Sequence, residues 1–156
     1  EQSGHIEAVG YELYCQLLEN AVRKAKHLPA KEHIHVQVDL PLSAFLPHDY
    51  VPPGRPKIEA YRKLAQAETK ADVDALGKEL RDRYGKWPKP VELLLVATEL
   101  KLLAGERGLV AIETKGDKLM LHRRGDFIQL GGKFPRLMKT EPLAVLKEIK
   151  KLLLSL

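Results

Sequence analysis

The sequence predicts an α+β protein: an N-terminal linker helix, followed by a compact helical module with a small antiparallel sheet. A change of apolar periodicity leads to this prediction. Apolar residues recur at helical spacings of three and four along residues 5–26 and 56–103, whereas residues 109–123 read as short strands. The resulting order is helix, strand, helices, strands, helix, with no internal repeat and no low-complexity tract.

Composition indicates a soluble globular protein. The chain has 156 residues, of which 44% are apolar and 30% are charged, and this length fits one domain with at most a helical appendage. No apolar run is long enough to span a bilayer, and residues 1–10 are too polar for a signal peptide. Cys15 is the single cysteine, which suits a reducing compartment. We therefore expect a cytoplasmic protein without a membrane partner.

The first part of the chain is predicted to contain one long helix and one strand. Residues 5–26 carry an amphipathic helical pattern, and Pro29 ends it. Residues 34–40 alternate between apolar and polar side chains, which is typical of a half-buried strand. Five prolines in residues 41–56 predict a stiff connector without regular structure.

Helices are predicted next. The first covers residues 56–67, and the side chains expected to face inward are Ile58, Tyr61, Leu64 and Ala65. Thr69 and Asp72 resemble a capping box that opens the second helix, and Gly85 is placed to end it. The residues that this second helix should bury are Val73, Leu76 and Leu80.

A third, leucine-rich helix is expected to be central in the module. Pro90 suits its first turn, residues 93–103 supply its leucines, and Gly105 and Gly108 are expected to end it.

Strands and one more helix complete the predicted order. Residues 109–114 and 119–123 read as strands joined by a turn, and residues 127–130 as a possible third strand. Thr140 is expected to cap a last helix over residues 142–154.

The net charge of +5 is concentrated late in the chain. Residues 115–139 contain seven Lys or Arg and two Asp residues, so this stretch alone carries +5 and the rest sums to zero. We call it the basic segment. Its cations are candidates for contact with nucleic acid or with a partner: Lys115, Lys118, Arg123, Arg124, Lys133, Arg136 and Lys139.

Signs of catalysis are weak. Residues 131–133, Gly-Gly-Lys, lack the spacing of a phosphate loop and favour a plain turn. His33 and His35 share one strand face, but a metal site needs three or four ligands. Cys15 lies among leucines, and His122 has no evident partner for acid–base chemistry. We therefore expect no catalytic residue, no metal site and no cofactor in this chain.

Four stretches in order resemble the C-terminal end of bacterial transcription-repair coupling factors. They are residues 2–14 (QSGHIEAVGYELY), 46–52 (LPHDYVP), 61–65 (YRKLA) and 82–91 (DRYGKWPKPV). Each stretch alone is a weak signal, but four in the family's order make a specific one. The resemblance covers residues 1–108.

The resemblance implies a longer parent protein, a superfamily-two DNA translocase with ATP and Mg bound upstream. Such a parent displaces RNA polymerase stalled at lesions and recruits the UvrA repair protein. Residues 1–28 would be a linker helix that ends the translocase module, and residues 29–156 a C-terminal regulatory domain. Gln2 would be the remnant of the translocation motif, whose arginine is absent from this sequence.

The implied role of the regulatory domain is autoinhibition. The domain would pack against the parent's N-terminal repair-recruiting module, mask its UvrA-binding surface and restrain translocation, and would not itself be an enzyme. An alternative from the charge pattern is an accessory domain that grips duplex DNA through residues 115–139 without sequence preference. A small independent enzyme is a third alternative, which the missing catalytic groups disfavour.

Overall fold

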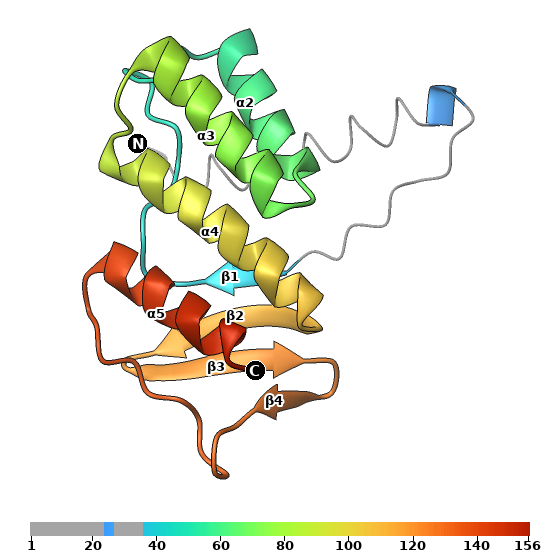
Figure 1. Ribbon diagram of the computed structural model, residues 1–156, viewed down its shortest axis with the longest axis vertical. Coiled ribbons are helices and arrows are strands. Elements are labelled where there is room, and N and C mark those ends of the chain that lie inside the picture. The colour runs from blue at the N-terminus through green and yellow to red at the C-terminus, as the bar shows by residue number, and fades with distance from the viewer. Residues whose placement is uncertain (1–23, 27–35) are drawn as a thin grey trace. The chain divides into compact units, whose positions relative to one another are not determined.

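The computed structural model describes residues 24–26 and 36–156, and these confirm the α+β class (Figure 1). The predicted helix over residues 5–26 lies mostly outside the described residues, where only Lys24 and Ala25 are seen to be helical. The described chain divides into two compact units, one of residues 43–95 and one of residues 36–42 and 96–156. The boundary predicted at residue 28 falls outside the described residues.

The first unit contains α2 (Arg55–Gln66), α3 (Lys70–Tyr84) and the beginning of α4 (Lys89–Glu106). Ahead of α2, residues 43–54 contain no helix or strand, as the prolines predict. The core residues of this connector, α2 and α3 are Leu46, Val51, Ala60, Tyr61, Leu64, Val73, Leu76 and Leu80.

The inward face of α2 differs from the prediction at two positions. Tyr61 and Leu64 are buried as expected, but Ile58 and Ala65 are only half-buried. Ala60 and Lys57 are buried instead, and the Lys57 ammonium contacts Nδ1 of His48 in the connector. The buried face of α2 is therefore rotated by a fraction of a turn from the face predicted from apolar residues. The reason is that a lysine with a polar partner lies on the buried side.

Helix α3 begins and ends as its sequence predicts. The Thr69 hydroxyl accepts a hydrogen bond from the Asp72 amide, and the Asp72 carboxylate accepts one from the Thr69 amide. At the other end, the Gly85 amide donates to the Arg81 carbonyl at 2.9 Å. Gly85 has a φ of +94°, which favours glycine at the end of the helix.

Trp87 fastens the α3–α4 turn onto the side of α3. Its indole N–H donates to the Gly77 carbonyl at 2.8 Å, and the Arg81 guanidinium lies 4.1 Å from the ring centroid. A Cβ atom at Gly77 would lie 2.9 Å from a carbon of the Trp87 ring and 3.3 Å from a Leu95 methyl. Gly77 is therefore required by close packing rather than by its backbone conformation.

The connector is fastened to the helices by two tyrosines. The Tyr61 hydroxyl accepts a hydrogen bond from the Leu46 amide at 2.9 Å. The Tyr50 hydroxyl lies 2.7 Å from the Gly85 carbonyl and 3.2 Å from the Leu80 carbonyl, so it donates at the C-terminal end of α3. Burial raises the pKa of Tyr50, and the nearby Arg81 charge offsets part of this effect.

The second unit is built on a four-stranded sheet in the order β1-β2-β3-β4. The strands are β1 (Gln37–Asp39), β2 (Leu109–Lys115), β3 (Lys118–Arg123) and β4 (Asp126–Ile128). The predicted antiparallel sheet is confirmed for β2, β3 and β4, but β1 is parallel to β2, so the sheet is mixed. A parallel neighbour requires a long crossover connection, which residues 43–95 supply.

Helices cover one face of this sheet. Ile112 and Leu121, paired across β2 and β3, are fully buried, and so is Leu119. Helix α5 (Pro142–Leu154) lies over this side (Figure 1) and buries Leu146, Ile149 and Leu153, the three core positions of its inner stripe. The end of α4 joins the same layer, where Gly105 lies against Val36, beside β1.

Polar contacts tie α5 to α4 within the second unit. Lys150 of α5 forms an ion pair with Glu99 of α4. The Arg107 side chain, just after α4, donates to the Leu153 carbonyl at 2.8 Å. This carbonyl lies in the last turn of α5, where it also accepts a hydrogen bond from the Leu156 amide at 3.2 Å.

Three predicted boundaries were displaced. Helix α4 continues through Gly105 to Glu106, and Gly108 follows with a φ of +76°. Strand β4 begins at Asp126 and ends at Ile128, two residues before the predicted end. The N-cap of α5 is Glu141 rather than Thr140, because Pro142 takes the first helical position and leaves the residue before it to accept the free amides.

Among the described residues, no helix has both the length and the apolar character needed to cross a membrane.

We predict that Gly77→Ala destabilises the protein by about 1–3 kcal/mol, because the rigid Trp87 ring must move to admit the methyl group. Gly105→Ala is the matched control: it is also a helical glycine, but its nearest neighbour would be 3.7 Å away. There the helix propensity of alanine should stabilise by up to about 1 kcal/mol. Urea unfolding followed by fluorescence of Trp87, the single tryptophan, measures both. Equal stability of the two variants would contradict this prediction.

We predict that Tyr50→Phe costs about 0.5–1.5 kcal/mol at neutral pH through loss of the hydroxyl's hydrogen bond. The raised pKa means that the folded state favours the neutral phenol. The contribution of Tyr50 to the free energy of unfolding is therefore fully present below the unfolded pKa of about 10. It is lost as the pH rises through the folded pKa of Tyr50. Unfolding of both proteins between pH 8 and 11 should therefore show the difference in stability shrinking above about pH 10. A constant difference would refute the linkage.

Candidate interaction surfaces

The structure distributes the basic segment along the β2–β3–β4 hairpins. Lys115 and Lys118 pair at the turn between β2 and β3, and Arg136 pairs with Lys118 in an isolated bridge. Arg123 and Arg124 lie at the opposite end of β3, five residues from Lys118, or about 17 Å along the strand. The cations that are adjacent in sequence therefore form two groups.

Ion pairs neutralise two of these cations. The Arg123 guanidinium binds both oxygens of Asp126, at 3.0 and 3.1 Å, and Arg136 binds Asp117 at 2.7 Å. These pairs are exposed, so each adds no more than about 1 kcal/mol to stability. They do, however, use both acidic residues of the basic segment.

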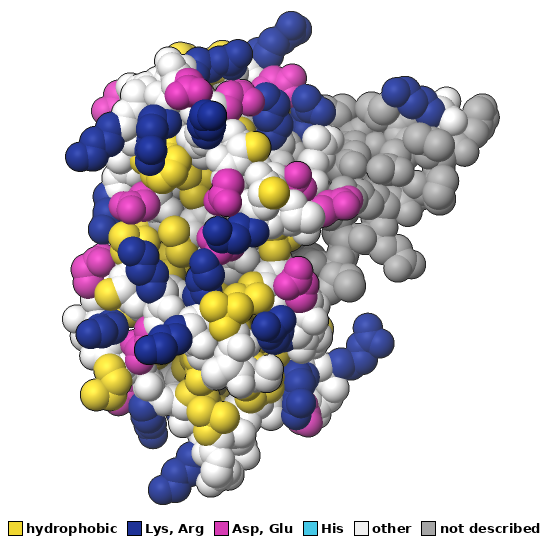
Figure 2. Space-filling model, in the orientation of Figure 1, with side chains coloured by type: hydrophobic (Ala, Val, Ile, Leu, Met, Phe, Trp, Pro, Cys, Tyr) yellow, Lys and Arg dark blue, Asp and Glu magenta, His cyan; other side chains and the backbone are white. Residues whose placement is uncertain are grey.

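Other cations of the segment remain available. Within the described part of the chain, no ion pair is found for Lys115, Arg124, Lys133 and Lys139. Lys118 lies over the Phe134 ring, with its Nζ 4.7 Å from the ring centroid. On the face shown in Figure 2, Lys and Arg side chains are spread among acidic ones and do not gather in one patch.

The Gly-Gly-Lys stretch is the turn that was predicted. Gly131 and Gly132 have φ values of +60° and +78°, and the flanking Leu130 and Lys133 exchange backbone hydrogen bonds of 2.8 and 3.2 Å. Glycine adopts this conformation at little cost. Gln2, Cys15, His33 and His35 lie outside the described residues.

His122 has a partner that sequence reasoning missed. Its Nε2 lies 2.6 Å from a Glu113 carboxylate oxygen, and both side chains are about a quarter exposed. The hairpin register explains this meeting: His122 pairs with Ala111 and Met120 with Glu113, so Glu113 and His122 are diagonal neighbours on one face. The turn predicted at residues 115–118 already implied this diagonal pair, because it sets the register of the two strands.

Aromatic rings continue from this pair across the sheet. The His122 and Phe127 ring centroids lie 4.5 Å apart, and Phe127 meets Phe134 at 5.3 Å and an interplanar angle of 83°. Glu113, His122, Phe127, Phe134 and Lys118 thus form one connected array, which we call the aromatic array. It lies on the sheet face opposite the buried Ile112 and Leu121.

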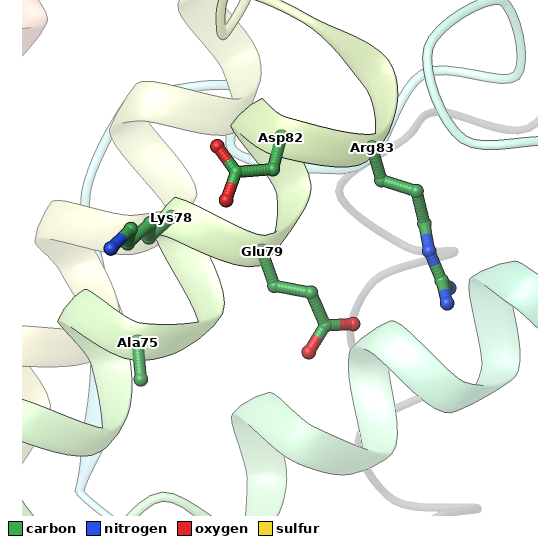
Figure 3. Close-up of a pocket in the computed structure, with 5 residues that line it drawn as sticks. All are labelled: Ala75, Lys78, Glu79, Asp82 and Arg83. Atoms are coloured by element: carbon green, nitrogen blue, oxygen red, sulfur yellow. The ribbon is translucent and has the colours of Figure 1, made fainter.

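A second surface lies on α3, in the first unit. A shallow depression of about 490 Å³ is lined by residues on successive turns of this helix (Figure 3), namely Ala75, Lys78, Glu79, Asp82 and Arg83. Glu79 forms an ion pair with Lys63 of α2 at 2.9 Å. Among the described residues, Lys78, Asp82 and Arg83 have no ion pair. We call this the α3 surface.

The two surfaces carry charged and aromatic side chains. The described residues contain no group of three His, Cys, Asp or Glu side chains that could hold a metal ion. The α3 surface offers charges of both signs without a nucleophile, and His122 is held by Glu113 beside aromatic rings. Exposed aromatic rings beside charged groups are common in surfaces that bind a macromolecule.

Comparison with known proteins identifies the family of the chain. The TRCF domain family matches residues 40–126, more than half of the chain. The transcription-repair-coupling factor of Staphylococcus aureus strain USA300 is 38% identical over 124 residues, which are 78% of this chain and 11% of that protein. The same factor of Staphylococcus haemolyticus strain JCSC1435 is 36% identical over 121 residues, 76% of this chain and 10% of that protein.

A solved structure shares the fold. The crystal structure of a C-terminal domain of transcription-repair coupling factor superposes with a TM-score of 0.60 at 21% identity, covering 76% of this chain and 93% of that domain. The expectation raised by the four sequence stretches is thereby confirmed. The chain belongs to the TRCF-domain family, as the C-terminal region of a bacterial transcription-repair coupling factor.

Proposed function

We propose that this chain is the autoinhibitory C-terminal domain of an ATP-dependent DNA translocase that couples transcription to nucleotide-excision repair. In this proposal the domain docks on the parent's N-terminal repair-recruiting module, masks the UvrA-binding surface and restrains translocation. RNA polymerase engagement releases it. ATP and Mg act in upstream parts of the parent, which works in the cytoplasm, and this chain performs no chemical step.

The observation that carries the proposal is the match to coupling factors over only about a tenth of their length. A segment of this size that folds around its own buried residues, without a group of catalytic side chains in the described part, suits a regulatory role in a larger machine. The relatives that it matches are transcription-repair coupling factors, so we expect its partners to be transcription and repair proteins.

The α3 surface is the docking site that we favour for the N-terminal module. Contacts between domains of one chain that must open and close are modest in area and partly polar. Lys78, Asp82 and Arg83 are exposed and carry no ion pair in the described structure, so pairing with a partner would break no existing ion pair of theirs. The depression gives a partner side chain a place to seat.

Deleting residues 28–156 from the parent should raise both its ATPase rate and its affinity for UvrA. The physical reason is a shift in population between a docked and an open state of the N-terminal module. Without the docked domain, the module is always in its open state. Steady-state ATPase assays and UvrA titration by biolayer interferometry would measure both. Unchanged UvrA affinity after the deletion would overturn the masking proposal.

Asp82→Lys should weaken binding of the chain to the separately produced N-terminal module by about tenfold or more, since it replaces one charge of the α3 surface by its opposite. Glu106→Lys is the matched control, because Glu106 is also an exposed acid in the last turn of a helix. Both substitutions improve interaction with the helix dipole, so neither should unfold the protein. Calorimetric titration of both variants gives the answer, and equal affinities would move the docking site elsewhere.

A second candidate function is DNA contact by the basic segment. The observation that favours it is the set of cations without an ion pair, Lys115, Arg124, Lys133 and Lys139. Phosphate contacts by such side chains produce binding that weakens steeply with salt.

A further inference from the structure

One face of the sheet in the second unit is covered by no described helix of that unit. Helix α5 and the end of α4 pack on the face that buries Ile112 and Leu121. The opposite face carries alternate residues of β3, which are Lys118, Met120 and His122, and Glu113 of β2. We call it the open face.

An exposed aromatic side chain marks one end of the open face. Phe127 of β4 pairs with His122 and keeps 38% of its surface exposed. All the large exposed hydrophobic residues of the described chain belong to the second unit, and the register of β3 and β4 places Phe127 on the open face. An exposed ring offers a large apolar contact area to a binding partner.

Positive charges are in excess around the open face. The nearby acids Asp117 and Asp126 each pair with an arginine of the same unit, Glu113 forms a hydrogen bond with His122, and Asp39 on β1 has no ion pair among the described residues. Lys115 projects beside Lys118 at one end, and Arg124 follows the other end of β3. A ligand that spans the face therefore meets cations near both ends, and between them the rings of His122 and Phe127 beside the carboxylates of Glu113 and Asp39.

We propose that the open face binds single-stranded DNA, with a base stacked on the exposed side of Phe127 and phosphates near Lys115 and Arg124. Sheet-borne aromatic rings with flanking cations are suited to unpaired bases, since every base has a π-face. A duplex hides its base faces in its own stack, and an uncharged protein partner would leave the excess cations unmatched. The choice of DNA rather than RNA rests on the proposed function. The location of the binding site on the open face does not depend on the proposed function.

The test is fluorescence anisotropy of the full 156-residue chain with a labelled 16-nucleotide oligo(dT), a duplex of the same length and an oligo(U). Phe127→Ala should weaken oligo(dT) binding by about five- to 150-fold, the range for loss of one stacked base. Lys115→Gln should lower the salt dependence by about 0.7 in the slope of log affinity against log salt.

Controls come from α5, on the covered side of the sheet. Leu154→Ala removes a side chain that is 56% exposed, and Lys147→Gln removes an exposed cation. Both variants should bind oligo(dT) as the wild type does. Circular dichroism checks that each variant is folded, and Phe127→Leu, which keeps the apolar volume but not the ring, serves if Phe127→Ala is unstable.

Each outcome decides the inference. Preference for oligo(dT), lost with Phe127→Ala and kept with the α5 variants, supports it. Preference for the duplex, or indifference to Phe127, overturns it in favour of phosphate contact alone, and tighter binding of oligo(U) reassigns the face to RNA. Binding to no nucleic acid at low salt also overturns it. The proposed autoinhibition is unaffected by these results, because module binding is measured with the Asp82 and Glu106 variants.

Discussion

The parallel pairing of β1 with β2 is the constraint on which the rest of the structure depends. It joins Gln37, Val38 and Asp39 to Ala111, Ile112 and Glu113, more than 70 residues further along the chain. Two neighbouring parallel strands cannot be linked by a tight turn. Everything between them is therefore a crossover, and its residues 43–95, with the connector, α2, α3 and the beginning of α4, form a unit with its own core.

This arrangement separates two kinds of surface. The crossover unit is rich in polar groups on α3, where its charged residues line a shallow depression. The sheet unit presents aromatic and apolar side chains on an open face, with cations at the ends of its strands. Because each unit has its own buried residues, each surface is supported by a separate core.

Local signals in the sequence were reliable where the physics is local. The Thr69–Asp72 capping box, Gly85 at the end of α3 and Pro90 in the first turn of α4 depend on neighbouring residues alone, and all three are confirmed. Position errors arose where a distant partner decided the outcome. Lys57 is buried with a polar contact to His48, and α4 continues through Gly105 where it packs against Val36 of the second unit. Helix propensity carries no record of such neighbours.

The sequence by itself determined the α+β class, most of the helices and strands, and the family, since periodicity, caps and ordered motifs are written in short stretches. It also located the excess positive charge in residues 115–139. Only the tertiary structure decided that β1 runs parallel to β2, that these cations separate into two groups, and that His122 meets Glu113 and Phe127. The physical reason is strand register: it depends on turns and pairing across the sheet, and a shift of one residue would move each side chain to the other face.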